Sequence, residues 1–430
     1  MHTHDYILTN GRTLSGDTVD IEIRSGIIDR IVPAGEGDPG DFDSDRQHDA
    51  NRRLVTPPLI EPHLHLDATQ TAGDPSWNKS GTLTEGIEIW DGYKKDISVS
   101  DIVDRATRTV EWYVAHGVTR IRTHADVTES SLTTIEALVE LRNQLSDIVD
   151  IQIVAFPQDG VFTNYNHEAL LRESAEMGVD LIGAIPHAEH TREDGVASIN
   201  LACDLAESFD MGLDLHIDET DDPGSRFTEV LASEAMKRDI GQKTVASHAT
   251  ALHSYPNSYA EKVISLLAES DVSVITNPPD NSVLQGSYDD YPRRRGHTRI
   301  DELQEAGVTV GIGHDSVLDP WYHYGVADPL DAAFILVHYA HMAGRGDVET
   351  LWQMLTEANA DVLGIEGYGL QEGTRGSLVV FDAPDGFNAL RQQPARTLVV
   401  NAGKPVAETE PANSHVYREN GTQSVSFNYE

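Results

Sequence analysis

The chain is 430 residues long and carries 71 acidic against 31 basic side chains, a formal net charge of -40 at pH 7. This length exceeds one small domain and fits a barrel plus an accessory domain. The charge argues against nucleic acid or an anionic membrane as a partner. The single cysteine, Cys203, excludes an intrachain disulfide.

Lysine is scarce, since only seven of the basic residues are lysines. Excess acid with few lysines is typical of a protein dissolved in concentrated salt, where screening removes the self-repulsion of the charge. We therefore expect a cytoplasm of high internal salt, with an ordinary acidic protein as the alternative. The sequence has no signal-peptide pattern and no run apolar enough to span a bilayer, which predicts a cytoplasmic protein.

The N-terminal segment, residues 1–56, has the pattern of a small β-domain. From Asp5 to about Val32 apolar and polar residues alternate around two turn signals, Asn10-Gly11 and Ser25-Gly26. Such alternation with turn residues is typical of β-hairpins. A polar loop follows.

Residues 57–372 alternate short β-branched runs with longer amphipathic segments. The first run passes through Leu59, and the other seven span residues 119–124, 151–158, 181–187, 213–216, 244–248, 272–277 and 308–315. Eight such alternations predict the α/β class and a (β/α)8 TIM-like barrel. A doubly wound open sheet is the competitor. The collection of polar residues at the ends of the runs favours the barrel mouth.

Residues 373–430 again read as short strands, at 377–382 and 397–403. We expect the two ends of the chain to meet in one small β-sandwich domain beside the barrel.

Two histidines separated by one residue, His63 and His65, end the first barrel run. Side chains at i and i+2 of an extended chain point the same way, so the pair forms half of a site for a first-row metal. A similar pair, His2 and His4, follows no apolar strand and is interpreted as a solvated terminus.

The other half of the site is expected from later strands. His216 ends the fifth run and Asp315 ends the eighth, which adds an imidazole and a carboxylate at the same barrel mouth. Such a set suits a divalent metal with a position left for water. Glu219 follows His216 closely enough to act on that water without being a ligand, and His248 ends the sixth run.

Longer motifs extend this interpretation to a family. The chain resembles the amidohydrolase superfamily, and within it the bacterial-type cytosine deaminases, along nearly its whole length. The shared segments are Glu61-Pro62-His63-Leu64-His65-Leu66-Asp67, Trp77-Asn78-Lys79-Ser80-Gly81-Thr82-Leu83, Phe156-Pro157-Gln158, His216-Ile217-Asp218-Glu219, Ser247-His248-Ala249-Thr250-Ala251-Leu252-His253-Ser254-Tyr255 and Asp319-Pro320-Trp321-Tyr322.

The resemblance implies a role for each matching residue. One Fe²⁺ or Zn²⁺ would be bound by His63, His65, His216 and Asp315, which is also counted with the catalytic groups. Glu219 would carry protons, and His248 would hold the attacking hydroxide. The substrate would be contacted by Gln158, the backbone of Leu83, and Trp321. The resemblance also implies a homo-oligomer that salvages pyrimidines by converting cytosine to uracil and ammonia.

The chemistry agrees with these roles. A bound divalent cation lowers the pKa of its water from 15.7 to about 7. One carboxylate can then protonate ring N3 and the leaving amine, which is the role of Glu219. A primary amide such as Gln158 offers an acceptor and a donor side by side, matching N1–H and O2 of cytosine.

One absence limits the metal count. Two-metal members of the superfamily generally bridge their metals with a carboxylated lysine at the fourth strand. This sequence has no lysine between Lys95 and Lys237, and its fourth run ends in Pro186-His187. A single metal is predicted.

The chain departs from the resemblance after the aspartate ligand. Cytosine deaminases commonly have a second acid there, whereas this sequence reads His314-Asp315-Ser316, and the segment Asn277 to Asn281 is more acidic than expected. Ser316 is assigned to substrate binding. With a serine at this position, the substrate could instead be a related cyclic amidine, such as a substituted cytosine, creatinine or another base. A non-catalytic metal-binding barrel is a further alternative.

Overall fold

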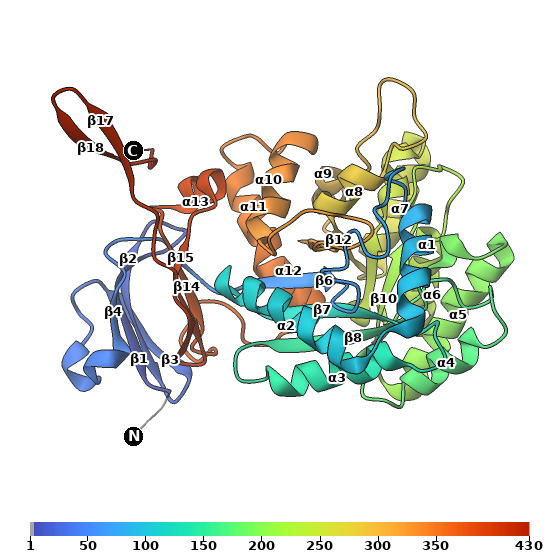
Figure 1. The fold of residues 1–430 in the computed structure, drawn as a ribbon, viewed down its shortest axis with the longest axis horizontal. Helices are drawn as coiled ribbons and strands as arrows, with labels where there is room; N and C mark the ends of the chain where they lie inside the picture. Colours follow the sequence, from blue (N-terminus) through green and yellow to red (C-terminus); the bar gives the residue numbers. More distant parts are fainter. Residues whose placement is uncertain (1–3, 430) are drawn as a thin grey trace.

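The computed structural model describes residues 4–429, so His2 lies outside the described residues. His4 is half-buried, and its Nδ1 donates to the carbonyl of Ala402 at 2.9 Å. Two lobes are visible in Figure 1: a β-domain that contains both ends of the chain, and a larger α/β barrel. No helix of residues 4–429 is long and apolar enough to cross a membrane.

Eight parallel strands form the barrel, and they occur at all eight predicted positions. They are β6 (Leu59–Leu64), β7 (Val118–Asp126), β8 (Asp150–Phe156), β9 (Leu181–Ile182), β10 (Gly212–Ile217), β11 (Thr244–His248), β12 (Ser273–Thr276) and β13 (Val310–Ile312). Their order in the sheet is their order in the chain. The predicted barrel is therefore confirmed, and the open doubly wound sheet is excluded.

The barrel closes between its last and first strands. Leu64 and Asp315 form a parallel bridge, in which Asp315 N donates to His63 O at 2.9 Å and His65 N donates to Asp315 O at 3.1 Å. Below this bridge, Glu61 Oε1 accepts hydrogen bonds from the backbone N–H groups of His63 (3.1 Å) and His314 (3.0 Å). The seam of the barrel thus joins three of the segments that carry the predicted site.

Helices surround the barrel (Figure 1). They are α1 (Leu83–Tyr93), α2 (Val99–Ala115), α3 (Thr133–Gln144), α4 (His167–Ser174), α5 (Arg192–Phe209), α6 (Thr228–Arg238), α7 (Asn257–Glu269), α8 (Pro278–Leu284), α9 (Ile300–Glu305), α10 (Pro329–Tyr339), α11 (Asp347–Leu355) and α12 (Glu357–Leu363). Helix α2 illustrates why they form: the Ser98 hydroxyl accepts from Asp101 N at 3.2 Å as an N-cap, and an apolar face of the helix is buried.

Short 3₁₀ turns complete the helical segments, at η1 (Pro39–Asp41), η2 (Ser44–Arg46), η3 (Lys94–Asp96), η4 (Pro186–Ala188), η5 (Gly241–Lys243) and η6 (Thr250–Ser254). The first two lie in the loop predicted to be polar and irregular. Turns η4 and η6 follow barrel strands directly and so belong to the barrel mouth.

The β-domain is built from both ends of the chain, as predicted. One sheet has the order β3-β2-β1-β4 and the other β16-β15-β14-β5. Their bounds are β1 (Tyr6–Arg12), β2 (Thr18–Arg24), β3 (Ile27–Pro33), β4 (Gln47–Asp49), β5 (Val55–Thr56), β14 (Leu378–Phe381), β15 (Arg396–Asn401) and β16 (Lys404–Ala407), with α13 (Gly386–Gln392) between β14 and β15. Leu8 and Ile21 from one end pack with Leu398 and Val400 from the other in a shared core.

One turn prediction was wrong. Ser25-Gly26 does connect β2 to β3, but Asn10-Gly11 lies inside β1, where the register with β2 shifts. Asn10 has φ 55°, and a Cβ on Gly11 would lie 2.9 Å from Val55 Cγ1. The same Asn-Gly pair that favours a hairpin turn also suits a β-bulge, because both need a left-handed residue.

A hairpin that was not predicted extends beyond the second sheet. Strands β17 (Ser414–Arg418) and β18 (Gly421–Val425) pair only with each other and are almost wholly exposed. Figure 1 shows them projecting from the β-domain. The chain then returns to α13, where Asn388 Nδ2 donates to Tyr429 O at 2.9 Å.

Candidate metal centre and pocket

The four predicted ligands converge at the carboxyl ends of the barrel strands. His65 Nε2 lies 3.0 Å from His216 Nε2, and Asp315 Oδ1 lies 3.5 Å from His63 Nε2 and 3.6 Å from His65 Nε2. Two atoms that each bind a metal at about 2.1 Å are separated by about 3.0 Å at a right angle and about 3.4 Å at the tetrahedral angle. These three distances are compatible with one ion. The group of four whose ligand atoms all lie within 4.8 Å of one another consists of His63, His216, Asp315 and, in place of His65, His248.

The protonation of these histidines also fits a metal. Burial, followed by the charge of neighbouring histidines, holds the pKa of His63, His65 and His216 well below the usual range. They are neutral, so each has a nitrogen lone pair. His63 Nε2 is buried without a hydrogen-bond partner. A divalent cation would use lone pairs that otherwise repel one another.

A buried relay fixes which nitrogen of His63 carries the proton. The Ser247 hydroxyl donates to Asp214 Oδ1 at 2.6 Å, so its oxygen is left to accept from His63 Nδ1 at 2.9 Å. Asp214 Oδ2 in turn accepts from Arg122 at 3.0 Å. Burial opposes the ionisation of Asp214, but His124, Arg122 and Ser247 outweigh it and lower its pKa. The proton sits on Nδ1, and the lone pair on Nε2 points at the site.

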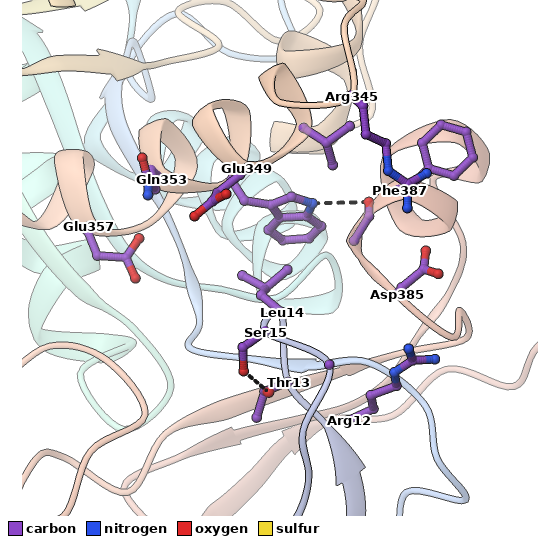
Figure 2. Close-up of a pocket in the computed structure, with 14 residues that line it drawn as sticks. Arg12, Thr13, Leu14, Ser15, Arg345, Glu349, Gln353, Glu357, Asp385 and Phe387 are labelled. Carbon is purple, nitrogen blue, oxygen red and sulfur yellow. Dashed lines mark hydrogen bonds between the residues drawn. The ribbon is translucent and has the colours of Figure 1, made fainter.

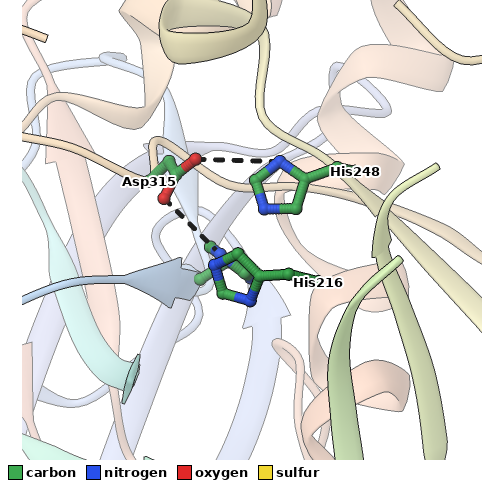
Figure 3. Close-up of side chains that lie close together, drawn as sticks. His216, His248 and Asp315 are labelled. Atoms are coloured by element: carbon green, nitrogen blue, oxygen red, sulfur yellow. Dashed lines mark ion pairs between the residues drawn. The ribbon is translucent and has the colours of Figure 1, made fainter. Parts of the chain in front are cut away.

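His248 and Glu219 lie beside the ligands. His248 Nδ1 is 3.8 Å from Asp315 Oδ2 and 3.6 Å from Glu219 Oε1. Figure 3 shows His216, His248 and Asp315 directed toward one another. The amide of Asn281 donates to His248 Nδ1 at 3.1 Å and to Glu219 Oε1 at 3.3 Å, which holds both side chains in place. Burial, followed by Asp280, raises the pKa of Glu219 well above its usual range, as suits a group that takes up and returns a proton.

All four residues assigned to substrate binding line one cavity next to the ligands. Leu83 begins α1, Gln158 follows β8, and Ser316 and Trp321 follow β13. Trp321 is only 6% exposed and lies directly under α1, since a Cβ on Gly86 would fall 2.4 Å from its ring. The residues around the cavity are His65, Leu83, Gln158, His216, Glu219, Asp280, Asp315, Ser316 and Trp321.

Asp280 also lines this cavity, although no role was predicted for it. The one feature of the sequence that pointed to it was the unexpected acidity of the Asn277–Asn281 segment. The Ser247–Asp214–Arg122 relay was also missed, because it joins three different strands. Asp67 and Asp126 brace loops near the barrel mouth: Asp126 N donates to Asp67 Oδ2 at 2.8 Å.

A second groove, between the β-domain and the barrel, contains none of the predicted site residues. Leu14, Trp352 and Phe387 contribute apolar surface there, and Trp352 Nε1 donates to Gly386 O at 3.1 Å (Figure 2). Nothing in its lining resembles the set of groups at the barrel mouth.

Comparisons with known proteins identify a family for the chain. Residues 98–407 match the model of the Amidohydrolase family. A solved structure of 5-methylcytosine deaminase from Klebsiella pneumoniae, liganded with 5-fluorocytosine, is 39% identical with a TM-score of 0.90, covering 94% of this chain and 98% of that one.

Two curated relatives act on other heterocycles. N-isopropylammelide isopropyl amidohydrolase from Pseudomonas sp. (strain ADP) is 29% identical over 94% of this chain and 98% of its own length. Pterin deaminase from Rhizobium rhizogenes is 27% identical over 91% of this chain and 88% of its own. The resemblance inferred from the motifs is confirmed.

Proposed function

The chain belongs to the amidohydrolase family, hydrolases of C–N bonds, and from this premise we propose that it is a mononuclear deaminase of cytosine and of cytosines with a small C5 substituent. Substrate and water would give uracil, or its C5-substituted form, and ammonia. The observation that carries the proposal is one cavity in which Gln158 and Glu219 meet the predicted ligands His65, His216 and Asp315.

Zinc or iron bound by His63, His65, His216 and Asp315 would supply a nucleophilic water at neutral pH. His248 lies beside both Asp315 and Glu219, where its imidazole would contact that water. Burial and then neighbouring histidines lower the pKa of His248 to about 3, so the imidazole stays neutral across the working pH range.

Glu219 would move the protons. Attack at C4 makes that carbon tetrahedral, which requires a proton on ring N3, and departure of ammonia requires another on the amine. One buried carboxyl beside the cavity can take a proton from water and deliver it to each position in turn. Asn281 fixes the Glu219 carboxyl, which lines the cavity, through a 3.3 Å hydrogen bond to Oε1.

Gln158 would select the pyrimidine edge, because its amide offers a donor to O2 and an acceptor to N1–H. Trp321 provides a flat apolar wall for the ring, and the backbone of Leu83 closes the cavity from α1. The buried, neutral Ser316 lines the side on which C5 and the amine would lie. Its small hydroxyl leaves room for a methyl group where a second acid would not. The 39% identity with a 5-methylcytosine deaminase supports this substrate class.

The test is a substrate panel on protein of measured metal content. Ammonia release would be followed with cytosine, 5-methylcytosine, creatinine and pterin, and isopropylamine release with N-isopropylammelide. We expect turnover of the first two, and Ser316→Asp should reduce the rate with 5-methylcytosine more than that with cytosine. If only another compound of the panel is hydrolysed, the proposed substrate is wrong, but the proposed reaction type still holds.

A second candidate is deamination of a different cyclic amidine on the same groups. It is favoured by Ser316 and by the curated relatives that act on isopropylammelide and pterin. The same panel separates it from the first.

A further inference from the structure

Asp280 is a buried carboxyl in the cavity for which the proposed reaction has no use. It lies in α8, directly after β12, and is 2% exposed. Ligand atoms of Glu219, Asp280 and Asp315 all lie within 4.8 Å of one another, and Asp280 contacts both the Asp315 carboxyl and the Ser316 hydroxyl. Glu219 and Asp315 have roles in moving protons and binding the metal, which leaves Asp280.

The contacts of Asp280 with Asp315 and Ser316 leave one of its oxygens without a partner. No ion pair joins it to a basic side chain in the described part of the chain, and the lining of the cavity contains no lysine or arginine. Its Oδ1 is buried without a hydrogen-bond partner. A buried oxygen that lacks a donor is strongly unfavourable unless a ligand supplies one. Asp280 and Ser316 line the same cavity.

The geometry points to Asp280 as the residue that recognises the exocyclic amine of the substrate, an inference that rests on the proposed function. The amine has two N–H donors, and Oδ1 of Asp280 accepts one of them. Asp280 thus supplies from α8 the acid that residue 316 lacks, so the amine is recognised while the C5 side stays open.

This assignment makes Asp280 a discriminator between substrate and product. Deamination replaces the amine, a donor, with a carbonyl oxygen, which only accepts. An oxygen that only accepts hydrogen bonds attracts the first and repels the second, so it favours binding of substrate and release of product. An amide at the same position has an N–H that can donate to the carbonyl.

The test is Asp280→Asn, with the inhibition constant for the product measured beside KM for the substrate. We expect KM for 5-methylcytosine to rise about tenfold or more, because a site built for a donor loses its acceptor. We expect thymine, the product, to inhibit more strongly than it inhibits the wild type. A variant that is merely damaged would bind both more weakly.

Two controls separate recognition from support of the metal site. Asp319→Asn makes the same change at a buried acid that lies near Ser316 but does not line the cavity, and should leave the ratio of the two constants unchanged. Pyrimidin-2-one, which lacks the amine, should bind wild type and Asp280→Asn equally. Bound metal per chain should be the same in all three proteins.

The inference is overturned by any of three results for Asp280→Asn: it loses metal, it binds thymine no better than the wild type, or its binding of pyrimidin-2-one is weakened as much as its binding of the substrate. Those results would mean that Asp280 acts by bracing Asp315. Should the wild type deaminate some other heterocycle, the proposed function fails, and the same comparison is then made with that amine and its carbonyl product.

Discussion

Replacing Ser247 by alanine removes the centre of the relay behind His63. Two buried groups lose a partner: the Nδ1–H of His63 and the Oδ1 of Asp214, which lie 4.0 Å apart and cannot bond each other without movement. Each such group is destabilising by about 1–3 kcal/mol, and partial relaxation should limit the loss of unfolding free energy to about 2–4 kcal/mol.

The same change should weaken metal binding. Without Ser247 nothing favours the tautomer of His63 that has its lone pair on Nε2. Loss of such an outer hydrogen bond typically reduces metal affinity 10–100-fold, equivalent to about 1.4–2.8 kcal/mol. Competition with a chromophoric chelator measures the affinity of the folded protein directly, and denaturant unfolding of the metal-free protein measures stability separately.

Ser198→Ala is the matched control. Ser198 is equally buried and donates a hydrogen bond to Gly195 O at 2.9 Å, but it lies in α5. It should lower stability by about 1 kcal/mol and leave metal affinity unchanged. If Ser247→Ala binds the metal within twofold of wild type, the relay does not prepare His63 and the reasoning is wrong.

Four further outcomes are expected. Glu219→Gln should keep its metal but lose roughly 10²–10⁴-fold in kcat, and a native rate would favour a non-catalytic barrel. Chelation should lower Tm and added Zn²⁺ or Fe²⁺ restore it, since an ion that binds only the folded state stabilises by about 2.7 kcal/mol at a hundredfold excess over Kd. Burial, and then His253, lowers the pKa of His297 to about 4. The unfolded chain therefore binds a proton below about pH 6.5 that the folded one refuses, so unfolding free energy should fall by up to about 3 kcal/mol between pH 6.5 and 4, and less in His297→Gln. Finally, Tm should rise as KCl increases from roughly 0.1 to 2 M, and full stability and activity in dilute buffer would contradict the expected salt dependence.

The fold and the positions of the predicted ligands were accessible from the sequence because both leave local signals. Buried parallel strands read as short β-branched runs, and the predicted ligands His216 and Asp315 stand where such runs end. The predicted length differs most from the observed length at β9. The predicted run extends from residue 181 to His187, whereas the strand has two residues.

What the sequence did not reveal depends on neighbours from distant strands. Ser247, Asp214 and Arg122 carry no spacing that relates them, and only closure of the barrel places them in contact. The role of Asp280 was hidden for the same reason. The hairpin of β17 and β18, by contrast, did have a signal in Asn420-Gly421 next to alternating residues, which is a usual hairpin turn.

The seam between β6 and β13 has a consequence for the order of events during synthesis. His63 and His65 belong to the first strand of the barrel and Asp315 follows the last, and the backbone of Asp315 pairs with both histidines. A nascent chain therefore holds two of the predicted ligands long before the fourth exists, and the proposed centre can form only when the final strand closes on the first. Metal uptake would then mark completion of the barrel, and the bound ion would lock the edge at which the barrel closed.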